Sequence, residues 1–261
     1  MDDLEKKMED ACVHVMSPVL QFMHYRMQGD VEKAGEIAKT ALTHGLSRNS
    51  REEILDDAFT FARDEVTSDE VSEAICLAMD REMSFEYPNL AIKYGGDPAK
   101  VEERMYSTML SHGAAQMLNN FEWTIPVETR QGIAGGRFDQ YIDIARREYS
   151  DKGYRFASKA LLAAELLGDP DKISMAAKSL ITQKIWVHDD KEAMELVQKH
   201  GITPKDVTWI AQELIHVNLR DGHTNHALEI AQKYAPQFLP ILEQIEKSIV
   251  NYKNPDVASI K

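Results

Sequence analysis

Histidines gather in one part of this sequence. Five of the nine lie between residues 188 and 226, namely His188, His200, His216, His223 and His226. Glu213 and His216 have the Glu-x-x-His spacing, which places a carboxylate and an imidazole on one face of a helix where they can ligate a metal ion. His223 and His226 follow shortly after and could add nitrogen ligands for a divalent ion such as zinc. Glu213, His216, His223 and His226 therefore form a candidate metal site of a small helical enzyme.

Structural roles also explain these histidines. His200 precedes a glycine at the expected end of a helix, where the helix dipole favours a partly positive ring, and His226 lies in an expected first turn. His188-Asp189 is similar to the paired ligands of metal-dependent phosphohydrolases, but the nearest upstream histidine is the distant His112. We interpret Asp189 or Asp190 as a cap for the helix that begins near residue 191.

Three glycines at positions 132, 135 and 136 are a second candidate for chemistry, since glycine lets a backbone approach a phosphate. Phosphate cradles of this kind follow a strand and open a helix, and no strand is expected before Gly132. We therefore predict a loop here that interrupts the helical pattern and ends at Arg137.

Helix boundaries are clearly marked along the chain. Asp97-Pro98, Asp169-Pro170 and Thr203-Pro204 each place a capping side chain before a proline. Reciprocal capping boxes are expected for Ser50 with Glu53, Thr67 with Glu70 and Asp189 with Glu192, and glycines 45, 113 and 201 are expected helix ends.

Between these marks the apolar residues follow helical spacing, for example at Val207, Ile210, Ala211, Leu214 and Ile215. Strand alternation bounded by hairpin turns is not found. The sequence predicts an all-α fold with no significant β-sheet. The expected helices are 3–27, 31–44, 51–65, 69–83, 98–118, 138–149, 154–167, 170–184, 190–199, 204–219, 225–234 and 237–250.

The composition narrows the class of partner. The chain has 261 residues, 43 acidic and 30 basic, for a formal net charge of −13. An acidic field repels phosphate backbones and anionic lipid surfaces, so neither nucleic acid nor membrane is expected as a partner. Only Cys12 and Cys76 are present, too few for a disulfide framework, and a reducing cytoplasmic location is expected.

A repeated segment appears in the last third of the chain. The segment 193–200 (AMELVQKH) is echoed by the segment 227–234 (ALEIAQKY), and the phrase Gly-Asp precedes an expected helix at Gly29, Gly96 and Gly168. The interval between the two segments, a period of about 34 residues in a helical chain, is typical of stacked helix hairpins. Over about residues 154–250 the chain resembles the tetratricopeptide-like α-helical repeats. That resemblance implies an α-solenoid, an array of antiparallel helix hairpins with an extended concave surface.

The middle of the chain interrupts this rhythm. Residues 85–137 mix aromatic residues, prolines and glycines, and we expect an irregular central segment between N-terminal helical hairpins at 1–84 and C-terminal helical repeats at 138–250, with a flexible tail at 251–261. The three parts are expected to form one continuous domain. Aromatic and arginine residues dominate binding energies, so Tyr87, Trp123 and Arg137 are the candidate partner-binding residues. The alternative is that the aromatic residues complete the core.

These observations favour a non-enzymatic protein- or peptide-binding helical-repeat module, with no catalytic residue and no cofactor. The first helix could also pair with a second copy of itself, so a homodimer is possible. One alternative is a small helical metal-dependent enzyme that uses Glu213, His216, His223 and His226. A second is a regulatory helical domain that senses a small molecule.

Overall fold

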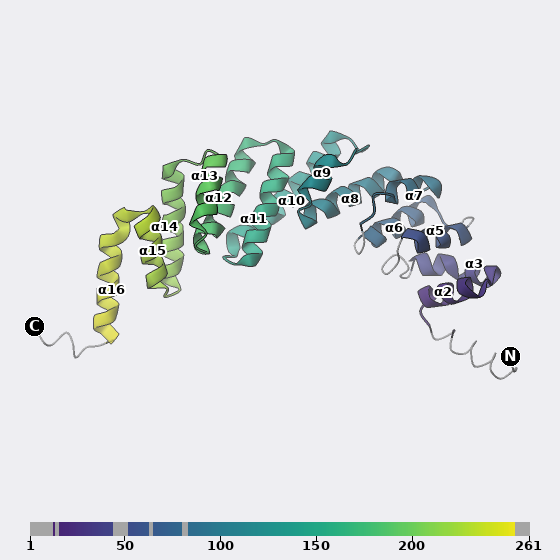
Figure 1. The fold of residues 1–261 in the computed structure, drawn as a ribbon, viewed down its shortest axis with the longest axis horizontal. Coiled ribbons are helices and arrows are strands. Elements are labelled where there is room, and N and C mark those ends of the chain that lie inside the picture. The colour runs from purple at the N-terminus through teal and green to yellow at the C-terminus, as the bar shows by residue number, and fades with distance from the viewer. Residues whose placement is uncertain (1–12, 14–15, 44–51, 63–64, 80–82, 254–261) are drawn as a thin grey trace, which may run out of the picture. The chain divides into compact units, whose positions relative to one another are not determined.

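The chain is all-α, as the sequence predicts. In a computed structural model, residues 13, 16–43, 52–62, 65–79 and 83–253 are described, apart from the side chains of 249–253. Their regular structure consists of helices, and no strand occurs among them (Figure 1).

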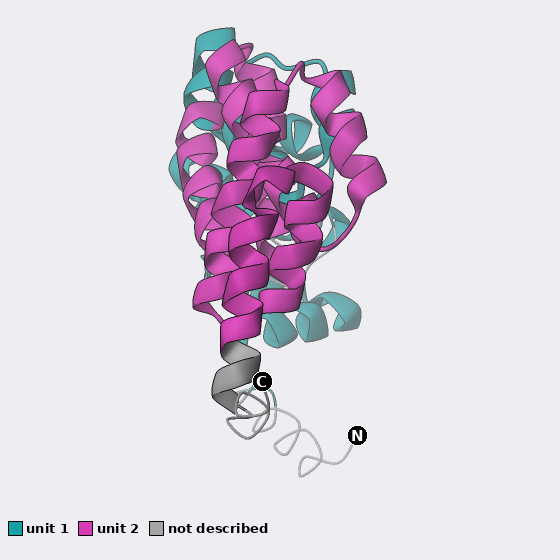
Figure 2. Ribbon diagram, turned by 90° about the vertical axis from the view of Figure 1, so that its left-hand side faces the viewer, with its two compact units in different colours: residues 1–133 teal, residues 134–261 magenta. Residues whose placement is uncertain are grey.

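Two compact units divide the chain, residues 1–133 and residues 134–261 (Figure 2). The helices described in the first unit are α2 (Pro18–Gln28), α3 (Val31–Ala41), α5 (Glu52–Phe61), α6 (Ser68–Met79), α7 (Tyr87–Lys93), α8 (Pro98–His112) and α9 (Ala115–Asn120). The boundary falls within α10 (Val127–Arg147). The second unit continues with α11 (Asp151–Leu167), α12 (Pro170–Trp186), α13 (Asp190–Lys199), α14 (Pro204–Arg220), α15 (Thr224–Tyr234), the 3-10 turn η2 (Pro236–Phe238) and α16 (Leu239–Lys253).

Helix starts follow the sequence closely. The carboxylates of Asp97 and Asp169 accept backbone N–H groups at the starts of α8 and α12. Thr203 and Asp206 cap α14 reciprocally, and Thr67 and Glu70 exchange hydrogen bonds in the same way before α6. These side chains satisfy N–H groups that have no partner within the helix. The expected cap at Ser50 and the expected end at Gly45 lie outside the described residues.

Some predicted boundaries were wrong. The range 98–118 is not one helix, because α8 ends at Gly113, which adopts a left-handed φ of 72°. The end expected at Gly113 is therefore confirmed, and the predicted range is too long. Residues 87–93 form α7, which was expected to be irregular. The predicted helix 3–27 is interrupted, because Met16 and Ser17 are not helical and α2 begins at Pro18, where Ser17 accepts the N–H of Leu20. Of the residues before Met16, Val13 is described and is helical.

The largest correction concerns the predicted loop at 132–137, because α10 runs through it without a break. The apolar face of this helix continues past the glycines through Ala134, Phe138, Tyr141 and Ile142, which are all buried. Packing of that face outweighs the cost of roughly 1 kcal/mol that each glycine imposes on a helix. The glycines therefore give no support to a phosphate site.

Two pairs of helices in the second unit begin at the same spacing along the chain. α14 has the same length as α12, 17 residues, and the pair α14 and α15 begins at Pro204 and Thr224 as the pair α12 and α13 begins at Pro170 and Asp190. α12 packs against α11, α13 and α14, and α14 packs against α15. Small side chains allow neighbouring helix axes to lie close together. The fully buried alanines of these helices are Ala157, Ala160, Ala163, Ala164, Ala176, Ala177, Ala193, Ala211, Ala227 and Ala231.

Candidate binding groove

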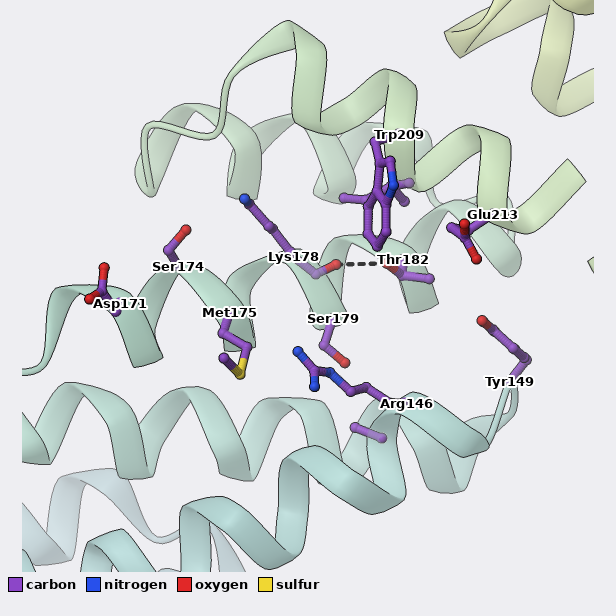
Figure 3. Close-up of a pocket in the computed structure, with 12 residues that line it drawn as sticks. Arg146, Tyr149, Asp171, Ser174, Met175, Lys178, Ser179, Thr182, Trp209 and Glu213 are labelled. Carbon is purple, nitrogen blue, oxygen red and sulfur yellow. Dashed lines mark hydrogen bonds between the residues drawn. The ribbon is translucent and has the colours of Figure 1, made fainter. Parts of the chain in front are cut away.

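A groove of about 640 Å³ lies in the second unit between α10, α12 and α14 (Figure 3). Its lining residues are Ala145, Arg146, Tyr149, Asp171, Ser174, Met175, Lys178, Ser179, Thr182, Trp209, Ile210 and Glu213. The largest contribution comes from α12, whose lining residues recur at intervals of three and four and so form one face of that helix. The opposite face of α12 is buried, which leaves this face available as the floor of the groove.

The end of α10 is held in place by buried contacts. The side-chain amide of Gln183 on α12 donates to the carbonyl oxygens of Ala145, at 2.9 Å, and Glu148, at 2.7 Å. A Cβ atom at Gly153 would lie 1.8 Å from the Glu148 carbonyl oxygen, so only glycine allows this approach. The carbonyl groups at the end of a helix need such donors, and here they come from the helix that forms the groove floor.

Two large apolar side chains lie in the groove, one on α12 and one on α14. Met175 on α12 and Trp209 on α14 are 37% and 59% exposed. The indole of Trp209 projects toward Thr182 (Figure 3). A large exposed indole beside hydroxyl groups can pack against an apolar side chain while neighbouring groups make hydrogen bonds.

Lys178 lies at the edge of the groove, but its charge is already paired. Its ammonium donates to the Asp206 carboxylate at 2.7 Å, and the Thr203 hydroxyl donates to the same carboxylate at 2.6 Å. The hydrogen bond from Lys178 and then that from Thr203 lower the pKa of Asp206 to about 2. The ion pair therefore persists throughout the neutral pH range.

Three other charged side chains line the groove, and unlike Lys178 they are not paired with a charge of opposite sign among the described residues. Among the described residues, none forms an ion pair with the guanidinium of Arg146 or with the carboxylates of Asp171 and Glu213. Arg146 extends toward Met175 and Ser179 in the centre of the view, with Asp171 at one end and Glu213 at the other (Figure 3). Burial, and then the charge of Glu213, raise the pKa of the Tyr149 hydroxyl, which stays protonated at neutral pH.

Tyr149 also begins a row of rings that leads away from the groove. Its ring centroid is 5.1 Å from that of Trp186, which is 5.2 Å from His226, and His226 is 4.3 Å from His188. Burial lowers the pKa of His226, and the neighbouring His188 lowers it further. The clustering of these histidines in the sequence thus reflects, in part, ring packing between the end of α12 and α15.

The four candidate metal ligands are not brought together as a metal site. Glu213 and His216 lie on exposed positions of α14, His223 is the residue before α15, and His226 packs in the row of rings. Within the described part of the chain, no three His, Cys, Asp or Glu side chains are grouped so as to hold a metal ion. Of the four, Glu213 lines the groove.

The three candidate partner-binding residues, Tyr87, Trp123 and Arg137, differ in burial and in the unit that contains them. Tyr87 is fully buried, so it presents no surface to a partner. Trp123 is half-buried, donates to the Leu118 carbonyl oxygen at 2.9 Å and packs edge-on against Tyr106. Arg137 lies in the second unit and donates to Gln140 at 3.2 Å. None of the three lines the groove.

A buried carboxylate explains why the segment around Trp123 is ordered. Glu102 on α8 accepts the N–H groups of Thr124 and Ile125, at 2.8 and 3.1 Å, and the Thr124 hydroxyl at 2.7 Å. Phe121 packs against Trp123 with ring centroids 4.5 Å apart. The aromatic residues of this part of the chain therefore contribute to the packing of the first unit.

Trp209 has a distinctive position in the helical pattern of the sequence, although it is not among the candidate residues predicted above. The buried face of α14 consists of Val207, Ile210, Ala211, Leu214 and Ile215, as the helical spacing predicts, with Asn218 in the last turn. Trp209 falls outside that face. A tryptophan on the polar side of an amphipathic helix is a marker of an interaction surface.

Comparison with known proteins identifies no relative: no family model, no curated protein and no solved structure matches this chain. Among the described helices, none is both long enough and apolar enough to cross a membrane.

Proposed function

We propose that this chain is a non-enzymatic protein-binding module, and that the groove between α10, α12 and α14 binds a short segment of a partner protein. The observation that carries the proposal is the exposed indole of Trp209 in a groove of about 640 Å³. Tryptophan is among the residues that contribute most to binding when a partner covers them. The hydroxyl groups of Ser174 and Ser179 line the same groove and can form hydrogen bonds with a partner. The Thr182 hydroxyl donates to the Lys178 carbonyl oxygen at 2.8 Å and can accept a hydrogen bond from a partner.

The resemblance to tetratricopeptide-like repeats supports the same function. Stacked repeats of this kind form an extended concave surface that binds partners. The starts of α12 and α14, and likewise those of α13 and α15, are 34 residues apart. The same spacing separates Met175 from Trp209, and both residues line the groove, which supports this interpretation. We interpret the second unit as an array of antiparallel helix hairpins, in which α12 and α14 supply the equivalent helices.

A peptide segment fits the groove better than a small molecule does. Sites for small molecules cover most of the surface of the ligand, typically about 70–90% or more of it. Here the largest apolar side chain, Trp209, is 59% exposed and Met175 is 37% exposed. An open surface of this kind suits a segment that remains attached to a larger partner.

Selection of random 12-residue peptides displayed on phage, with the full chain as target, tests this function. We expect enriched peptides whose affinity falls by at least about tenfold for Trp209→Ala. The matched control is Ile241→Ala, because Ile241 is 58% exposed in the same unit but lies outside the groove. Absence of enriched peptides, or equal binding to Trp209→Ala, would contradict the proposed function.

A further inference from the structure

The charges of the groove that have no ion-pair partner among the described residues form an ordered pattern. Asp171 lies at the beginning of α12, Arg146 extends toward Met175 and Ser179 in the middle, and Glu213 lies at the opposite end near Tyr149 (Figure 3). The order along the groove is therefore negative, positive, negative. A ligand that covers it must supply charges of the opposite sign in the same order or leave these groups without partners.

Among the described residues that line the groove, Arg146 is the one cationic side chain without an ion-pair partner. Lys178 is the other cationic side chain of the lining, and its ammonium is engaged by Asp206 at 2.7 Å. Within the groove, the guanidinium of Arg146 is left to receive an anion, and the carboxylates of Asp171 and Glu213 repel further negative charge. A single carboxylate matches this arrangement, and a phosphate with a charge near −2 does not.

The length of the groove sets the size of the segment. The lining residues of α12 run from Asp171 to Thr182. At about 1.5 Å per helical residue this stretch is about 16 Å long. An extended chain advances about 3.3 Å per residue, so about five residues cover it. The central charge of the ligand should then lie about two residues from each outer charge.

From these observations we infer that the partner segment carries one aspartate or glutamate that pairs with Arg146, with a lysine or arginine about two residues away on each side. An apolar side chain of the segment packs on Trp209. Arginine and a carboxylate form two parallel hydrogen bonds, so the acidic residue also fixes the register of the segment. This inference rests on the proposed function and specifies the chemistry of the partner.

The peptides selected on phage supply the probe. We expect an Asp or Glu between two basic residues to be enriched, and synthetic peptides in which that residue becomes Asn or Gln to bind at least about tenfold more weakly. Arg146→Glu should weaken the original peptide to a similar degree and restore binding of a peptide with Lys at the acidic position. Arg147→Glu is the matched control, because Arg147 is the next residue of α10 and pairs with Asp143 at 2.7 Å instead of lining the groove.

The possible results separate this inference from the proposed function. Peptides that need Trp209 but bind Arg146→Glu and Arg147→Glu equally would overturn the acidic-partner inference and leave the proposed function intact. Peptides that bind Trp209→Ala as well as the unchanged chain would overturn the proposed function. Restored binding of the Lys-containing peptide by Arg146→Glu, with circular dichroism unchanged, would support both.

Discussion

The side chain of Gln183 ties α12 to the end of α10, because its amide nitrogen lies 2.7 Å from the Glu148 carbonyl oxygen. The same nitrogen donates to the carbonyl oxygen of Ala145 at 2.9 Å, and Gln183 is 1% exposed. A single buried amide thus fixes the wall that carries Arg146 and Tyr149 to the floor formed by α12.

Replacement of Gln183 by Met should destabilise the protein by roughly 2 kcal/mol, because two carbonyl groups lose their donor while the volume of the side chain is kept. Urea denaturation followed by circular dichroism measures the free energy of unfolding. Gln198→Met, at an exposed position of α13, should change it by less than about 0.5 kcal/mol. Equal effects of the two substitutions would show that the Gln183 hydrogen bonds do not stabilise the groove wall.

Substitution of Gly136 tests the continuity of α10. A Cβ atom at Gly136 meets no atom within 4 Å, and the residue is helical, so Gly136→Ala should stabilise the protein by roughly 0.5–1 kcal/mol. Gly168→Ala is the matched control, because the added Cβ is equally free but φ is +65°, and it should destabilise by about 1 kcal/mol. A loss of stability at Gly136 similar to that at Gly168 would contradict a helical α10 at this point.

Asp206 should make stability depend on pH in acid. Its pKa is lowered from 3.8 to about 2 by the hydrogen bonds from Lys178 and Thr203. A lowered carboxyl pKa stabilises the folded state above pH 4, and this contribution is lost as the pH falls from about 4 to 2, where the unfolded state binds the proton more readily. The difference in unfolding free energy between the unchanged chain and Asp206→Asn should be constant above pH 5 and decrease below pH 4. A difference that stays constant down to pH 2 would exclude this ion pair.

His226 should also make stability depend on pH, but here the folded state disfavours the charged form of the side chain. Burial and then the neighbouring His188 lower its pKa below 6.5, so the folded state disfavours the protonated ring. Stability from this group is complete above pH 6.5 and is lost as the pH falls through the folded-state pKa. His226→Phe, which keeps a ring against Trp186, should reduce the loss of stability between pH 7 and 5. Titration of the His226 imidazole by NMR at a pKa of 6.5 or above would contradict this assignment.

Local signals in the sequence predict much of this fold. Oxygen-bearing caps before Pro98, Pro170 and Pro204 locate three helix starts, because capping depends on neighbours within four residues. The course of α10 depends instead on tertiary burial of Phe138 and Tyr141, which local propensity at the three glycines does not reveal. The groove is harder to predict, because it requires α10, α12 and α14 to be adjacent.

The candidate binding residues also show that local sequence patterns do not reveal which side chains are buried by packing between helices. Tyr87 is an aromatic residue in a segment that the sequence predicts to be irregular, but aromatic side chains also fill cores, and this one is buried. The helical spacing of α14 indicates an exposed Trp209, since this residue lies outside the apolar face. Its place in the same groove as Arg146 and Thr182 depends on the packing of separate helices, which the spacing of residues along the chain does not reveal.

Fluorine NMR of the full chain labelled with 5-fluorotryptophan tests the central claim most directly. The three tryptophans, Trp123, Trp186 and Trp209, give separate resonances that single Trp→Phe variants assign. Addition of a phage-selected peptide should shift the Trp209 resonance in a saturable manner, with a smaller shift for Trp186 behind Tyr149 and none for Trp123 in the first unit. An unchanged Trp209 resonance at a peptide concentration that saturates binding in calorimetry would contradict the groove as the binding site.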